Sequence, residues 1–170
     1  MRPNTEDHIP YFTYYIGLIP ETDVIQALQN NQQHIATFIR SIPEDKAGYR
    51  YAENKWSIKQ VINHVIDTER IMSYRALRFS RGDAQLLPGF DENLYADHAC
   101  LENSSLSLLA EEFETVRKAT ILFAKQLDET AWLRKGRMVA GEVNVLSLGY
   151  FICGHTQHHI QVIKERYLKQ

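Results

Sequence analysis

The hydrophobic positions of the chain recur at helical spacing in four long segments, separated by regions with proline and glycine. The first segment begins after Pro20, with Thr22 or Asp23 as its N-terminal cap, and ends before Pro43. Its apolar residues share one face, and the opposite face is rich in glutamine. The pattern predicts an amphipathic helix that buries one side.

The second segment has the most precise start signal. In the stretch WSIKQ, residues 56–60, Ser57 and Gln60 have the spacing of a capping box. In this motif the two residues satisfy each other's free backbone N–H groups. The apolar stripe then continues until it fades near the Arg81-Gly82 break.

The third segment runs from about Ser105 to Leu127, with apolar residues spaced alternately by three and four. The fourth opens with Asn144 as cap and continues to Tyr167. Strand-like alternation is nearly absent. Four amphipathic helices bury their stripes most simply against one another, so we expect an all-α fold, a four-helix bundle, formed by residues 1–170 as a single domain.

The connection between the second and third helices covers residues 81–104. It is longer than the usual helix-to-helix loop of about 2–8 residues. A connection of this length can be a crossover, a lid or a short extra helix. The flanking helices can therefore be parallel or antiparallel.

The amino-acid composition limits the classes of molecule that the protein is expected to bind. Nineteen basic and twenty-one acidic side chains nearly balance and are scattered, which disfavours binding to nucleic acid or to an anionic membrane. No apolar stretch has the length of a signal peptide core or a membrane span. Cys100 and Cys153 are too few for a disulfide framework. We expect a soluble, cytoplasmic protein that acts on a small molecule.

Two histidines fall on the apolar face of the fourth helix. In GHTQHH, residues 154–159, His155 and His159 lie one turn apart on the same side, so both imidazoles point at the core. Burying two neighbouring imidazoles without partners costs desolvation, and charging both adds repulsion. A divalent cation satisfies both rings. Carbonyls, carboxylates or water are the alternative partners.

His64 is the natural third ligand. It lies two turns into the second helix near the edge of the apolar stripe, a position that permits an inward ring without requiring it. Asp67, one turn further on, could orient His64 or lie in solvent. Three neutral imidazoles from two helices leave a coordination position for water or substrate, as in a catalytic site.

The remaining histidines are His8, His34, His98 and His158, and for each we favour a structural or solvent role. His98 could still approach the site if the long connection folds over it. Cys153 points away from His155 on the helical wheel and is expected to be a small buried residue.

Three stretches together resemble the DinB-like, or YfiT-like, family of small helical metalloproteins. They are IPEDKAGYRYAENKWSIKQVINHVIDTER (42–70), LPGFDENLYA (87–96) and GHTQHHIQVIKERYL (154–168). The resemblance implies a four-helix bundle, commonly a homodimer, with a divalent metal ion, zinc or nickel. The metal ligands that it implies are His64, His155 and His159. Many relatives carry glutamate where this chain has Gln60 and Thr156.

The resemblance also implies a reaction. Several relatives transfer a low-molecular-weight thiol, so we expect a metal-dependent thiol S-transferase that acts on a small electrophile. Metal-assisted hydrolysis is one alternative, although the sequence offers no obvious general base. A non-enzymatic, stress-related metal-binding bundle is the other. Side chains placed to assist transfer are Asp67, Gln60, Asp91 and Tyr95, although packing or turn formation also explains each of them.

Overall fold

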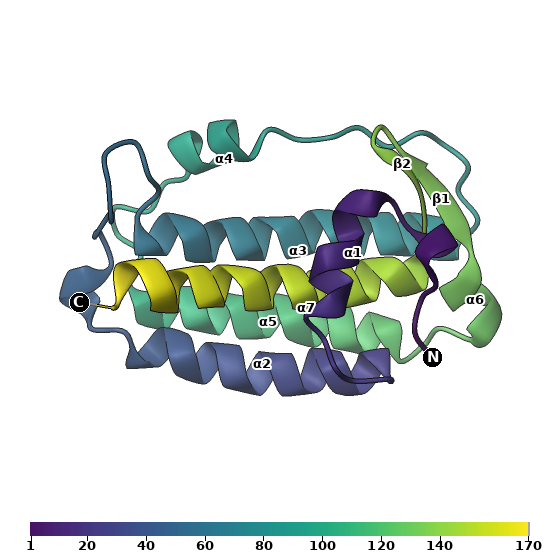
Figure 1. Ribbon diagram of the computed structural model, residues 1–170, viewed down its shortest axis with the longest axis horizontal. Coiled ribbons are helices and arrows are strands. Elements are labelled where there is room, and N and C mark those ends of the chain that lie inside the picture. The colour runs from purple at the N-terminus through teal and green to yellow at the C-terminus, as the bar shows by residue number, and fades with distance from the viewer. Residues whose placement is uncertain (170) are drawn as a thin grey trace.

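The computed structural model describes residues 1–169, and four long helices form its body (Figure 1). They are α2 (Val24–Ser41), α3 (Ile58–Ser80), α5 (Leu106–Ala124) and α7 (Val145–Val162), and α7 continues into a π-helical turn, Ile163–Tyr167. Helices α2 and α3 each pack against both α5 and α7. The expected all-α four-helix bundle is confirmed.

The long helices begin at the capping residues that the sequence indicates. Asp23, rather than Thr22, caps α2 by accepting a hydrogen bond from the backbone of Gln26. The capping box of Ser57 and Gln60 is formed in both directions at the start of α3. Such caps satisfy backbone N–H groups that have no partner within the helix.

Residues 81–104 form a crossover that contains a short helix, α4 (Glu92–His98). This segment runs back along the outside of α3, so that α3 and α5 start at the same end of the bundle and run parallel (Figure 1). A hydrogen bond of 2.6 Å from Lys59, near the start of α3, to the carbonyl of Leu101, just before α5, agrees with this arrangement.

Several short elements were not predicted from the pattern. They are α1 (Pro10–Gly17), α6 (Glu129–Leu133), the strands β1 (Lys135–Met138) and β2 (Gly141–Asn144), and 3-10 turns at Thr5–Asp7 and Glu44–Lys46. The two strands form an antiparallel hairpin. Strands of four residues are too short to display a clear alternation. The backbone of Leu87, in the crossover, pairs with the hairpin at Arg137 and Val139.

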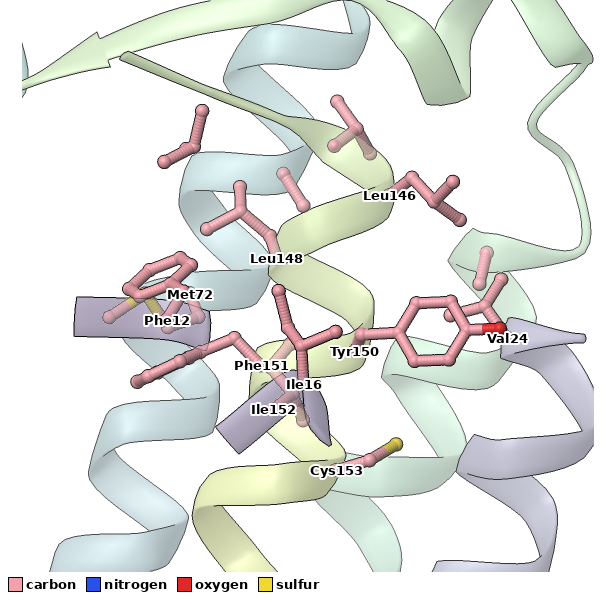
Figure 2. Packing of buried hydrophobic residues seen from close by; sticks show 14 of the residues in the cluster. Phe12, Ile16, Val24, Met72, Leu146, Leu148, Tyr150, Phe151, Ile152 and Cys153 are labelled. Atoms are coloured by element: carbon pink, nitrogen blue, oxygen red, sulfur yellow. The ribbon is translucent and has the colours of Figure 1, made fainter. Parts of the chain in front are cut away.

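The buried hydrophobic residues form two clusters at opposite ends of the bundle. Figure 2 shows part of the first, in which Phe151 points toward Phe12 and Met72 while Tyr150 points toward Val24 on the other side of α7. The rings of Phe12 and Phe151 are stacked with centroids 4.0 Å apart. Helix α1 is thereby held against α7. The second cluster begins on α7 at Ile160, so the histidines of α7 lie between the clusters.

None of the helices formed by residues 1–169 combines the length and the apolar character that a membrane-spanning segment requires.

Candidate metal centre

The three histidines singled out by the sequence meet between α3 and α7. The Nε2 atom of His155 lies 3.1 Å from Nε2 of His64 and 3.1 Å from Nε2 of His159. His155 is buried, and the other two are partly buried. The helical register places His155 and His159 one turn apart, and the packing of α3 against α7 brings His64 to them.

These two distances are close to those between ligands of a shared cation, and the ligand nitrogens of the three histidines all lie within 4.8 Å of one another. Ligand nitrogens at 2.0–2.1 Å from a tetrahedral metal ion stand about 3.3 Å apart. Ordinary hydrogen bonding does not account for both contacts, because a neutral Nε2 atom either donates one proton or offers one lone pair. His155 can thus form one good hydrogen bond to its neighbours, and the second contact remains unexplained. The donor set fits a divalent metal ion.

Burial keeps the three imidazoles neutral. Desolvation lowers the pKa of His64 to about 4, although the nearby Glu92 carboxylate partly opposes the shift. Desolvation, with His64 and His158 nearby, lowers the pKa of His159 to about 3. The pKa of His155 falls well below its ordinary value, mainly through burial and next through its proximity to His159. Neutral rings are the form that binds a metal ion.

Aromatic side chains hold the rings in place. Trp56 lies against His64 with centroids 4.9 Å apart, and Phe151 stacks on His155 at 5.4 Å. Tyr15 of α1 approaches His155 from another side, at 5.7 Å. Because α1 is part of this wall, the N-terminal segment contributes directly to the site.

A cavity of about 480 Å³ opens beside the three histidines. Its lining includes Phe90, in the part of the crossover that precedes α4, and Glu92, the first residue of α4. Among residues 1–169, Glu92 is the only carboxylate that lines the cavity, and no Lys or Arg of this range lines it. The sequence did not indicate Glu92 as a site residue, because turn formation explains an acidic residue next to Asp91 equally well.

Thr68, which also lines the cavity, was missed as well. Its position one turn after His64 on α3 was the available signal, since residues four apart share a helix face.

The side chains that the sequence offered for assisting the reaction do not line the cavity beside the histidines. Asp67 accepts a hydrogen bond of 2.7 Å from Asn63 and lines a different cavity, so it does not orient His64. Burial raises the pKa of Asp67 above its ordinary value. Gln60 closes the capping box and donates to the carbonyl of Ala96, which ties α3 to α4. Of the two roles left open for Asp67, the orientation of His64 is excluded, because α3 presents this carboxylate to the other cavity.

The other candidates have structural positions. Asp91 caps α4, and Tyr95 and His98 line the cavity that contains Asp67. Thr156 donates to the carbonyl of Ile152 and is buried, so it has no acid–base role. Cys153 is fully buried, and desolvation raises the pKa of its thiol to about 12, as expected for an inert packing residue.

Comparison with known proteins agrees with the geometry. The sequence matches the DinB superfamily over residues 27–163. A candidate metal-dependent hydrolase of Oceanobacillus iheyensis is 23% identical over 157 residues, which cover 86% of this chain and 88% of that protein. YfiT of Bacillus subtilis, described as a probable metal-dependent hydrolase with an unusual four-helix bundle topology, superposes with a TM-score of 0.72. That match has 15% sequence identity and covers 84% of this chain and 82% of YfiT, so it establishes the shared fold.

Proposed function

The chain belongs to the DinB superfamily, and from this premise we propose that it is a metal-dependent hydrolase of a small molecule, with His64, His155 and His159 as the metal ligands. The observation that carries the proposal is the convergence of three neutral imidazoles with Nε2 contacts of 3.1 Å. Three protein ligands leave a position open, as in catalytic zinc sites. Zinc and nickel both suit imidazole ligands.

Hydrolysis replaces the thiol transfer expected from the resemblance. Both relatives are described as metal-dependent hydrolases, and neither is described as a transferase. A hydrolase needs only water as its second substrate. Homodimer formation and a cytoplasmic location remain predictions.

Individual residues of this chain have separate roles in the proposed reaction. When bound, a divalent ion polarises a substrate carbonyl and lowers the pKa of water. Trp56 and Phe151 fix the orientation of the His64 and His155 rings. The aromatic side chains make much of the cavity wall apolar, which strengthens electrostatic interactions there relative to bulk water.

We assign proton transfer to Glu92. A general base must accept the proton of the attacking water, and Glu92 is the only carboxylate in the described part of the chain that lines the cavity. Its negative charge is near enough to His64 to oppose the lowering of that histidine's pKa. The protonated carboxyl group can then give the proton to the leaving group as the carbonyl–heteroatom bond breaks, so that the proton taken from water is accounted for.

The test begins with purified protein whose metal is removed with a chelator and restored with zinc or nickel. We expect one metal ion per chain and metal-dependent release of carboxylic acid from members of a panel of neutral esters and amides. Failure to restore metal at one equivalent would refute the proposal, and so would hydrolysis that is equally fast without metal.

Cobalt-substituted protein separates hydrolysis from thiol transfer. A thiolate that coordinates cobalt gives an intense charge-transfer absorption band. If a low-molecular-weight thiol produced that band while the protein hydrolysed no ester or amide, the transfer reaction would replace hydrolysis.

A further inference from the structure

A separate cavity of about 310 Å³ lies between α3 and the crossover. It adjoins the cavity beside the histidines, because Gly89 and Phe90 line both. Among residues 1–169, two arginines, Arg70 and Arg75, line the separate cavity, and no Asp or Glu does. The rest of its wall is largely apolar or aromatic, through Ile71, Tyr74, Leu87, Pro88, Phe90 and Tyr95.

The two arginines of this cavity differ in their partners. Arg70 donates a hydrogen bond of 2.7 Å to Glu112 and lies 3.6 Å from the carboxylate of Asp67, so its charge is balanced. Arg75 forms no ion pair with any carboxylate of residues 1–169. Burial lowers the pKa of Arg75, and no nearby carboxylate opposes that shift.

Arg75 is nevertheless only 6% exposed. Buried charges are normally paired, because an unpaired charge away from water costs free energy. Arg117, the other buried arginine in the described part of the chain, follows this rule through its two hydrogen bonds to Glu69. Arg75 therefore carries a buried positive charge that lacks a counter-charge.

The guanidinium group of Arg75 lies at the wall of the cavity. Its Nη2 atom donates a hydrogen bond of 2.6 Å to the carbonyl of Pro88, an exposed residue of the lining. Its Nη1 atom donates to the sulfur of Met72, which is a weak acceptor. The Nε atom has no hydrogen bond within residues 1–169, and the only fully buried N and O atoms of this range without a partner belong to Thr68 and Asn144. The Nε–H group of Arg75 therefore retains accessible surface.

We infer that this cavity is a second ligand site, in which Arg75 binds the carboxylate of an organic monoanion and the apolar wall holds the hydrocarbon or aromatic body of that ligand. One unpaired guanidinium group balances one negative charge, which favours a monocarboxylate over a doubly charged phosphate. The carboxylate accepts a charge-assisted hydrogen bond from Nε–H, and burial of the apolar body adds to the affinity. The site requires neither the metal ion nor hydrolysis, so it stands or falls separately from the proposed function.

A matched pair of compounds tests the role of charge. 3-Phenylpropanoate and 3-phenylpropanamide have nearly the same shape, but only the first is an anion at neutral pH. We expect chelator-treated protein to bind the carboxylate at least about tenfold more tightly than the amide, the effect of one hydrogen bond to a charged group. Calorimetric titration measures both affinities. Equal affinities would overturn the inference, and so would a preference found only when metal is restored, because the carboxylate would then bind the metal.

The variant Arg75→Met keeps an unbranched side chain and removes the charge. We expect it to bind the two compounds equally and to unfold at the same temperature as the parent protein or higher, since it leaves no carboxylate unpaired. Arg81→Met is the matched control, because Arg81 is an exposed residue at the end of α3 that does not line the cavity, and it should retain the preference. A preference that survives Arg75→Met would refute the assignment.

The Nε–H group of Arg75 gives a direct readout that does not depend on the folding of Arg75→Met. Its signal in a proton–nitrogen correlation spectrum is assigned by its absence from Arg75→Lys. We expect 3-phenylpropanoate to shift this signal in the parent protein, whereas 3-phenylpropanamide should leave it in place. If the carboxylate bound without moving the signal, the anion would lie elsewhere and the inference would fail.

Discussion

Arg117 of α5 donates two hydrogen bonds to Glu69 of α3, at 2.7 and 2.9 Å, in a place where neither side chain is more than 1% exposed. The guanidinium also donates to Asn31 of α2 and to Thr156 of α7. One side chain therefore contacts the three other long helices. Because Thr156 follows His155 directly, this network fixes the spacing between the helices that carry the metal ligands.

Breaking this pair should destabilise the fold and disturb the site. Arg117→Met leaves the Glu69 carboxylate buried and unpaired, so we expect a loss of about 3–5 kcal/mol in the free energy of unfolding. Chemical denaturation measures it. The double variant Glu69→Leu with Arg117→Met removes both charges and should be more stable than Arg117→Met alone. A double variant that is less stable would show that the unpaired charge is not the cause.

Metal content should depend on each of the three histidines. We expect His64→Ala, His155→Ala and His159→Ala each to lower metal affinity by at least about tenfold, the effect of losing even a supporting contact. Elemental analysis after dialysis against a metal buffer measures it. His158→Ala is the matched control on the same helix, because His158 contacts Tyr14 and does not belong to the histidine cluster. Full metal content in His64→Ala would show that α3 contributes no metal ligand.

Proton transfer should depend on Glu92. In Glu92→Gln we expect kcat for the best hydrolysed substrate of the panel to fall by about a hundredfold or more, with metal content unchanged. Asp97→Asn serves as control, because Asp97 is exposed on the same short helix and does not line the cavity. Loss of metal in Glu92→Gln would assign this residue a ligand role instead.

Gly154 permits α1 to pack closely against α7. A Cβ atom at Gly154 would lie 2.0 Å from the carbonyl oxygen of Tyr15, a backbone atom that can move only with α1. We expect Gly154→Ala to cost about 1–3 kcal/mol in the free energy of unfolding by overpacking and to weaken binding of benzohydroxamic acid, an aromatic metal chelator, because Tyr15 lines the cavity. Gly17→Ala, where a Cβ meets nothing within 4 Å, should leave binding unchanged. Calorimetry measures both effects.

The raised pKa of Asp67 predicts how the stability of the fold changes with pH. Its pKa is raised by burial in the folded chain, so the folded state binds more protons than the unfolded state around that pKa. Its contribution to stability is therefore present at low pH and is lost as pH rises through the raised pKa. We expect Asp67→Asn to become progressively more stable than the parent protein from pH 4 upward, while metal content stays the same. An advantage that shrinks with rising pH would contradict the burial argument.

The sequence predicted the parts of the fold that depend on local pattern. Helix starts at Ser57 and Asn144 follow from capping chemistry, and the four amphipathic stripes follow from periodicity. The pair formed by His155 and His159 was also visible, because residues four apart on one helix are neighbours wherever the helix lies. Short elements such as α1 and the hairpin escaped prediction, because their stability comes from packing on the bundle.

What the sequence by itself determined was a helical bundle with two imidazoles on one buried face. Only the tertiary structure decided that the crossover makes α3 and α5 parallel, that His64 reaches His155 while Asp67 faces another cavity, and that Glu92 and Thr68 join the wall. The physical reason is that periodicity fixes which residues share a helix face. The partner of that face is chosen by burial of apolar surface across the whole chain, which no local window contains.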